Sequence, residues 1–98
     1  MLEVRQTAAF KLWLDNLSDN LAAKRIALRI ARLGSGLFGD VKPVGDGLSE
    51  LRIDHGPGYR VYFVRQGKII VLLLCGGDKK TQDRDIKAAK AMLKQLGG

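Results

Sequence analysis

The spacing of apolar and polar residues predicts a strand and two helices in the first third of the chain. Residues 2–6 alternate between the two kinds of side chain, which is typical of a half-buried strand. Thr7 can cap a helix that extends to about Ser18 and repeats its apolar residues every three or four positions. A second capping signal at 18–20 begins another helix, which ends at Gly34. Because the connection is so short, we expect a helical hairpin.

The rest of the chain alternates between turn residues and apolar runs. Residues 34–47 hold many glycines and are expected to form an irregular loop. Three strand patterns follow, at 48–54, 58–65 and 68–75. Gly76 and Gly77 then turn the chain, and Thr81 can cap a last helix over 82–96. The pattern predicts a small α+β fold with an N-terminal strand, a helical hairpin, a three-stranded antiparallel meander and a C-terminal helix.

Alternation within the meander also predicts its register. Pairing Leu51 with Val61 keeps the apolar residues of the first two strands on one face. Arg52 then lies opposite Arg60, and like charges in a cross-strand pair repel each other. Either an anion binds between the two arginines, or the carboxylate of Glu50, on the same face, neutralises them.

The third strand of the meander raises a question of burial. In the same register, Ile69, Val71 and Leu73 share a face with Arg60. An apolar half-face of this kind is costly to leave in water. We expect either the last helix or a partner protein to cover it.

The length of the chain indicates the number of domains, and its net charge indicates the kind of partner. The 98 residues suit a single domain, 1–98, with one core. Seventeen Lys and Arg against ten Asp and Glu give a net charge of +7, which favours nucleic acid or an acidic protein as a partner. Lys79 and Lys80 follow the last strand of the meander and are expected near Arg60. Together they are either part of a phosphate-binding patch or solvated surface.

The sequence contains no recognisable motif for metal binding, for a phosphate-binding loop or for a catalytic triad. The chain has no Cys and His spacing for a metal, no Gly-rich phosphate loop and no Ser-His-Asp set, so we expect neither metal nor cofactor. The lone Cys75 cannot form an internal disulfide. The longest apolar run, 69–75, is too short to span a membrane, and no signal peptide is recognised. A cytoplasmic protein without membrane contact is expected.

Residues 47–92 resemble a known family. They contain, in order, the elements ELR, GPGYRVYF and LLLCGGDKKTQ, followed by DI and an alanine. This combination is similar to the phage-derived addiction-module killer proteins, a HigB-like branch of the RelE/ParE toxin superfamily. The N-terminal half is compatible with the same family but less distinctive.

The resemblance implies the toxin of a type II toxin-antitoxin module. Related RelE and HigB toxins are metal-independent endoribonucleases that cut mRNA on the ribosome. The ribose 2′-OH attacks the adjacent phosphate, while basic side chains stabilise the charge of the transition state. The implied partners are mRNA on the ribosome and a helix-turn-helix antitoxin, encoded by an adjacent gene, with which the toxin forms a hetero-oligomer.

The resemblance also suggests which residues act. Arg60 matches the sheet arginine that contacts the scissile phosphate, and Lys79 and Lys80 match a second basic cluster. These three are the expected catalytic residues. Further RNA contacts are expected from Arg52, Arg84 and Lys87, although Arg52 could instead be a structural partner of Glu50.

One departure from the family concerns proton transfer. RelE carries a tyrosine after its last strand, whereas residues 81–86 here contain none. Asp83, His55 or a displaced lysine could take the proton, or catalysis could rest on electrostatic stabilisation alone.

Two other functions remain compatible with the resemblance. A ParE-like toxin would bind DNA gyrase through its surface without enzymatic activity. A degenerate family member would act only as a DNA-binding complex with its antitoxin.

Overall fold

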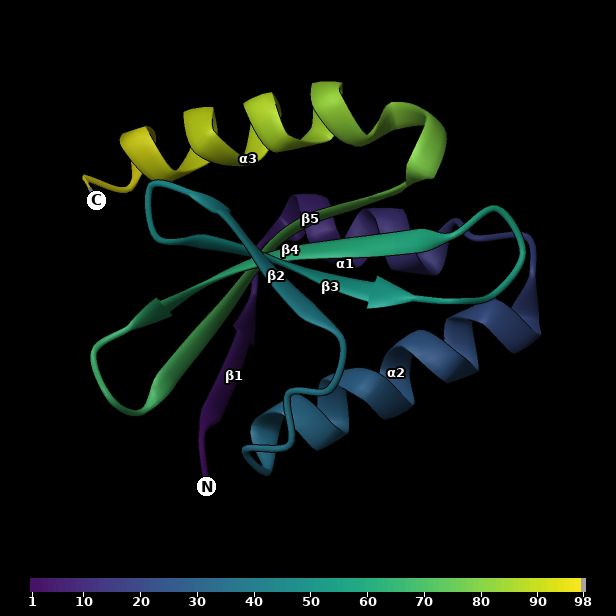
Figure 1. Cartoon of the computed structure of the whole chain (residues 1–98), viewed down its shortest axis with the longest axis horizontal. Coiled ribbons are helices and arrows are strands. Elements are labelled where there is room, and N and C mark those ends of the chain that lie inside the picture. The colour runs from purple at the N-terminus through teal and green to yellow at the C-terminus, as the bar shows by residue number, and fades with distance from the viewer. Residues whose placement is uncertain (98) are drawn as a thin grey trace.

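The computed structural model describes residues 1–97. Its elements are β1 (Glu3–Gln6), α1 (Ala8–Asp15), α2 (Asn20–Gly34), β2 (Val41–Gly45), β3 (Leu48–Ile53), β4 (Tyr59–Gln66), β5 (Ile70–Asp78), a 3-10 turn at Lys79–Thr81 and α3 (Gln82–Gln95). The five strands form one sheet in the order β1-β5-β4-β3-β2 (Figure 1). Strand β1 is parallel to β5, and the other pairs are antiparallel. The predicted α+β fold and its meander, β3 to β5, are confirmed.

The helices begin where the capping residues predicted. The Thr7 side chain accepts a hydrogen bond from the Phe10 amide at 3.0 Å, and its hydroxyl donates to the Leu74 carbonyl at 2.6 Å. Asp19 accepts from the Ala22 amide at 3.1 Å. Each cap satisfies an amide that the first helical turn would leave without a partner.

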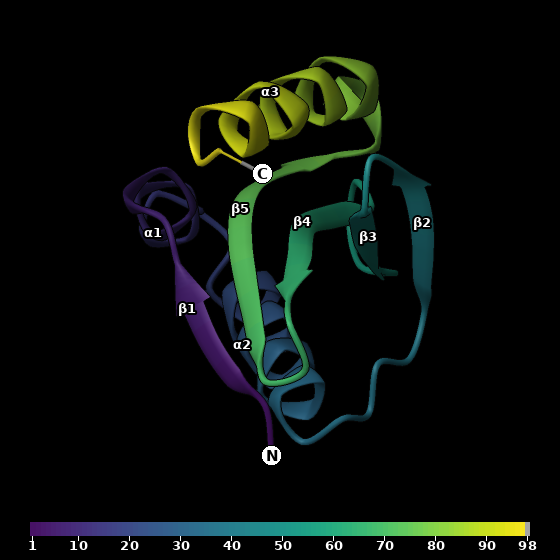
Figure 2. The same cartoon turned by 90° about the vertical axis from the view of Figure 1, so that its left-hand side faces the viewer.

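Helices cover both faces of the sheet. Helices α1 and α2 lie against one face, and α3 crosses the other (Figure 2). The first face carries the larger core cluster, with these buried members: Phe10, Ile26, Leu33, Leu51, Ile53, Val61, Phe63, Val71 and Leu73. Under α3 lies a smaller cluster: Leu48, Tyr62, Val64, Leu74, Ala89 and Leu93.

The expected irregular loop at 34–47 contains a strand, so that expectation was wrong. Strand β2 pairs with β3 at the edge of the sheet, where Pro43 is tolerated because no further strand needs its missing N–H. Asp46 and Gly47 form the two-residue turn, with φ values of 57° and 79°. An Asp-Gly pair with both φ angles positive is a favoured hairpin turn, and it was the available signal.

Gly76 and Gly77 do not turn the chain, which corrects a second expectation. They continue β5, opposite Val61 and Arg60 of β4. A side chain at Gly76 would overlap the Trp13 ring, and one at Gly77 would overlap the Asp85 carboxylate. The glycines are therefore needed because helices α1 and α3 press on the strand from opposite faces.

The start of α3 also differs from the expectation. Thr81 precedes the helix but makes no capping hydrogen bond with its side chain. Instead Asp78 accepts from the amides of Lys80 and Thr81, at 2.8 and 3.2 Å. The Thr81 hydroxyl donates to the Asp85 carboxylate.

The apolar residues at the start of β5 do not share the face of Arg60, contrary to expectation. A bulge between Tyr62 and Phe63 sets Tyr62 opposite Cys75 and Phe63 opposite Leu73. The extra residue reverses the alternation, so Val71 and Leu73 are buried under α1 and α2. Ile69 lies in the preceding turn and is 61% exposed. The last helix was one of the two expected covers for these residues, but α3 lies on the opposite face and does not cover them.

Cys75 packs beside the cluster under α3, as expected for a thiol that behaves as a small hydrophobe. Burial raises the pKa of this thiol to about 11. Within residues 1–97, no helix is both long and apolar enough to cross a membrane.

Candidate functional site

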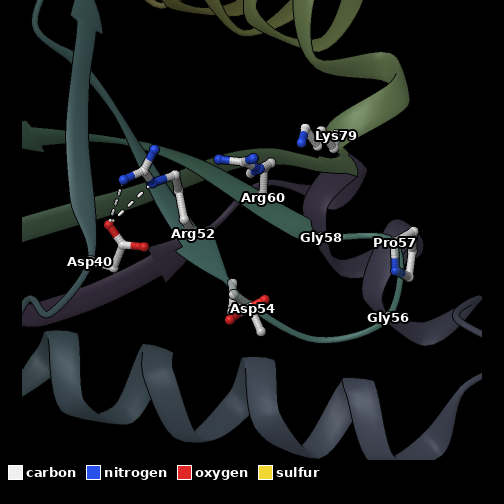
Figure 3. Close-up of a pocket in the computed structure, with 9 residues that line it drawn as sticks. Asp40, Arg52, Asp54, Gly56, Pro57, Gly58, Arg60 and Lys79 are labelled. Atoms are coloured by element: carbon white, nitrogen blue, oxygen red, sulfur yellow. Dashed lines mark hydrogen bonds and ion pairs between the residues drawn. The ribbon is translucent and has the colours of Figure 1, made fainter.

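A cavity of about 350 Å³ lies at the end of β3 and the start of β4. Its lining residues come from four segments: Asp40, Arg52, Ile53, Asp54, Gly56, Pro57, Gly58, Arg60 and Lys79. Figure 3 shows Arg52, Arg60 and Lys79 in a row along one side, with the 56–58 loop beyond them. We call this the β3–β4 cavity.

Arg52 and Arg60 face each other across the two strands, as the register predicted. Arg52 is bound by Asp40, which accepts from Nε at 3.1 Å and from Nη2 at 2.9 Å. These hydrogen bonds raise the pKa of Arg52, which therefore keeps its positive charge. Asp40 and not Glu50 is thus the partner of Arg52.

Glu50 is the partner of Arg60 and has no exposed surface. Its Oε1 accepts from Arg60 Nη1 at 3.0 Å, and its Oε2 accepts from Tyr62 at 3.1 Å and from Gln82 Nε2 at 2.8 Å. Burial, followed by the charge of Glu50, raises the pKa of Tyr62. We considered that the carboxylate of Glu50 neutralises both arginines. Each arginine instead has its own carboxylate, Asp40 for Arg52 and Glu50 for Arg60.

The ion pair leaves part of Arg60 unsatisfied. Its Nε is buried and has no hydrogen-bond partner among the described residues. Because a buried donor without a partner is costly, the site has an unused capacity to bind an acceptor.

Lys79 reaches the cavity because β5 extends to Asp78, which pairs with Tyr59. The 56–58 loop approaches it closely, with Gly58 at a φ of 82°. Lys80 is exposed and does not line the cavity. Arg84, 77% exposed, lies 3.6 Å from Asp85, and Lys87 is exposed further along α3.

Neither proton-transfer candidate lines the β3–β4 cavity. His55 Nε2 lies 3.2 Å from Asp19 at the start of α2, and Asp83 is exposed in the first turn of α3. Two other carboxylates do line it, those of Asp40 and Asp54. Asp54 directly follows the last residue of β3, and its closeness to Arg52 in sequence was the available signal.

The cavity thus combines three cations with two carboxylates. An anion there would meet two guanidinium groups and an ammonium, and guanidinium groups bind phosphate through two parallel hydrogen bonds. The first guanidinium is fixed by Asp40 and the second by Glu50, so little reorganisation is needed on binding.

Comparison with known proteins identifies the family of the chain. The model of a family described as phage derived protein Gp49-like (DUF891) matches residues 13–94. An uncharacterized protein of Haemophilus influenzae is 51% identical over 96 residues, which cover 98% of this chain and 97% of the relative. The match covers most of the chain and includes every residue that lines the β3–β4 cavity, so the chain belongs to the phage-derived Gp49-like family.

Proposed function

We propose that this Gp49-like chain is the toxin of a type II toxin-antitoxin module, in the HigB-like branch of the RelE/ParE superfamily, and cuts mRNA on the ribosome. The observation that carries the proposal is the meeting of Arg52, Arg60 and Lys79 in the β3–β4 cavity. Such an activity takes place in the cytoplasm, where mRNA is translated.

The reaction would need positioned charge more than a nucleophilic side chain. The ribose 2′-oxygen forms a bond to phosphorus, the bond to the 5′-oxygen breaks, and a cyclic phosphate and a 5′-OH result. Arg60 and Arg52 would stabilise the additional negative charge on the phosphoryl oxygens. Lys79 would donate a proton to the leaving 5′-oxygen.

Asp54 is our candidate to accept the proton of the 2′-OH. It lines the cavity, and among residues 1–97 it forms no ion pair within 4.0 Å. Asp40, by contrast, is committed to Arg52. Asp54 would replace Asp83 and His55 in this role, since neither of these lines the cavity.

The proposed partners follow from the same assignment. A helix-turn-helix antitoxin, encoded beside the toxin, would form a hetero-oligomer with it and cover the basic cavity. Lys80 was expected to be catalytic, but it does not line the cavity, and we assign it instead to RNA contact. Arg84 and Lys87 of α3 remain proposed RNA contacts outside the cavity.

Cleavage of a translated mRNA, mapped by primer extension, tests this function. We expect the wild type to cut the mRNA. Arg60→Ala should cut it at least about 100-fold more slowly, the usual effect of losing one transition-state donor. Lys79→Ala and Asp54→Ala should also lose most of the activity. Lys68→Ala removes an equal charge in the turn after β4, far from the cavity, and should cut like the wild type.

Absence of cleavage by the wild type would overturn the enzymatic proposal. Cleavage that is equally fast in Arg60→Ala and Lys68→Ala would overturn the assignment of the site.

A ParE-like toxin that binds DNA gyrase is the second candidate. The observation that favours it is that Arg52 and Arg60 are already paired with carboxylates, as in a purely structural network. On this alternative, induction would cause DNA damage and filamentation while translation continued, and Arg60→Ala would be as toxic as the wild type if it folds.

A further inference from the structure

A second cavity, of about 250 Å³, lies between α2 and the end of β3. Its lining consists of Arg25, Leu28, Arg29, Arg32, Ile53 and Asp54. It shares Ile53 and Asp54 with the β3–β4 cavity, and Figure 3 shows Asp54 on the side that faces α2. We call this the α2 cavity.

Three arginines lie on one face of α2 because they are spaced four and three residues apart. Residues 20–34 include four basic residues and no acidic one. Among residues 1–97, Arg25, Arg29 and Arg32 form no ion pair within 4.0 Å. In the β3–β4 cavity, both arginines have a carboxylate. The α2 cavity therefore holds three arginines against one carboxylate, that of Asp54, and Asp54 forms no ion pair with any of them within 4.0 Å.

Arg29 connects the wall of the α2 cavity to strand β3, beside the β3–β4 cavity. Its Nη1 donates to the main-chain carbonyl of Arg52 at 2.8 Å. Its Nη2 is buried and has no hydrogen-bond partner among the described residues. Nη2 lies close to Gly39, which does not line the cavity, so the guanidinium is anchored between two segments and fixes this wall of the α2 cavity.

Apolar surface completes the α2 cavity. Leu28 is 52% exposed although it stands between the arginines, and Ile53 forms part of the wall. A nucleotide presents both an anionic phosphate and an apolar base or sugar face. Guanidinium groups bind phosphate through two parallel hydrogen bonds and also stack on bases.

We propose that the α2 cavity is a second phosphate subsite for an RNA strand whose scissile phosphate lies in the β3–β4 cavity. The choice of RNA as ligand rests on the proposed function. The two cavities adjoin at Ile53 and Asp54, which favours an extended polyanion over a separate acidic protein. The strand would pass around the end of β3, with the cleaved bond at Arg60 and a neighbouring nucleotide held by Arg25 and Arg32.

Binding of an uncleavable probe tests this subsite separately from catalysis. The probe is a fluorescein-labelled single-stranded RNA with 2′-O-methyl groups throughout, and its anisotropy is measured over a series of salt concentrations. Arg25→Ala/Arg32→Ala is compared with Lys68→Ala/Lys94→Ala, which removes the same charge from exposed positions elsewhere. All four side chains are exposed, so thermal unfolding should be nearly unchanged in both variants.

We expect the arginine variant to bind the probe at least 10-fold more weakly and the lysine variant to change binding less than threefold. The slope of log affinity against log salt should fall by about 1.4 in the arginine variant, since each phosphate contact on a single strand contributes about 0.7. Equal weakening in the two variants would mean general charge attraction and would overturn the subsite.

A second probe separates RNA from acidic protein. If labelled hexaglutamate binds as tightly as the RNA, and loses that binding in Arg25→Ala/Arg32→Ala, the cavity is a protein-binding site and the proposal is wrong. Retained, α2-dependent RNA binding without mRNA cleavage would overturn the endoribonuclease and leave the subsite intact.

Discussion

At the scale of single residues, the two arginines of the sheet differ in how they are held. Arg52 pairs with Asp40 where both side chains are partly in water, at 40% and 53% exposure. Arg60 pairs with Glu50, which is wholly buried and receives two further hydrogen bonds. An exposed pair contributes little to stability, whereas breaking a buried pair leaves a charge without compensation. Glu50 should therefore matter for folding as well as for the position of Arg60.

Replacing Glu50 tests this difference. We expect Glu50→Ala to lower the free energy of unfolding by about 3–5 kcal/mol, because Arg60 loses its buried counter-ion. Glu50→Gln, which keeps the shape and some hydrogen bonds, should cost less. Urea unfolding followed by the fluorescence of Trp13 measures both. Asp40→Ala is the matched control at the exposed pair, and an equal loss in Asp40→Ala would contradict the argument.

At the scale of elements, strand β5 is shaped by the helices on either side of it. Trp13 of α1 covers Gly76, and Asp85 of α3 approaches Gly77. Glycine is ordinarily unfavourable inside a strand, but here it removes the side chains that would separate the layers. The same arrangement prolongs β5 until Lys79 reaches the β3–β4 cavity.

Gly76→Ala should therefore destabilise the protein although it introduces a better strand former. We expect a loss of about 1–3 kcal/mol from overpacking against Trp13, measured by urea unfolding with far-UV circular dichroism. Trp13→Ala alone should cost about 3–5 kcal/mol. Because the clash is absent without the ring, the double variant should lose less than the sum of the two. Strict additivity would show that the ring is not what excludes a side chain at Gly76.

The Asp19 carboxylate, which caps α2, should make the stability of the fold depend on pH in the acid range. Hydrogen bonds from the Ala22 amide and from His55 lower the pKa of Asp19 below its ordinary value of 3.8. The charged carboxylate is thus more stable in the folded state. Its contribution is present above pH 3.8 and is lost as the pH falls through the lower, folded pKa.

We expect Asp19→Ala to lower the melting temperature by a few degrees at pH 7 and by less near pH 2, as measured by circular dichroism. Asp15→Ala, an exposed residue of α1, is the control and should show a smaller dependence on pH. A difference between wild type and Asp19→Ala that stays constant down to pH 2 would speak against the charged cap.

At the scale of the whole molecule, one sheet carries two cores. Strand β5 contributes Val71 and Leu73 to the cluster under α1 and α2, and Leu74 to the cluster under α3. Neither cluster can persist without the strands that they share. The molecule should therefore unfold as a unit, in the two-state manner usual for small domains.

Leu93→Ala, a change under α3, tests this unity from the far side of the sheet. Leu93 is largely buried, and we expect a loss of about 2 kcal/mol, the lower end for such truncations. Trp13 fluorescence and far-UV circular dichroism should report the same shifted transition. Leu96→Ala, at an exposed position, should have a much smaller effect. Separate transitions for the two probes would show that α3 unfolds independently.

Much of the fold could be predicted from local pattern, and the failures share a physical cause. Three predictions that depend on neighbours in sequence were confirmed: the cap at Thr7, a cap within 18–20 and the pairing of Arg52 with Arg60. The side on which Val71 and Leu73 lie was predicted wrongly, because one bulge reverses all later alternation in a strand. Gly76 and Gly77 suggested a turn, but they are required by packing. The Trp13 ring that excludes a Cβ at Gly76 is distant in sequence, and Asp85 reaches Gly77 because α3 folds back over the sheet.

In the candidate site, too, some features follow from the sequence pattern and others only from tertiary contacts. The sequence by itself determined that Arg52, Arg60 and Glu50 share a face, since alternation in paired strands requires it. It also indicated that Lys79 follows the strand beside Arg60. Only the tertiary structure decided that Asp40 binds Arg52, that Gln82 completes the Glu50 network from 32 residues away, and that α2 adds a second basic cavity. Asp40 meets Arg52 through the pairing of β2 with β3, a strand that the sequence analysis missed. The contacts of Gln82 and α2 join segments that meet only when the helices pack on the sheet, and local periodicity carries no record of them.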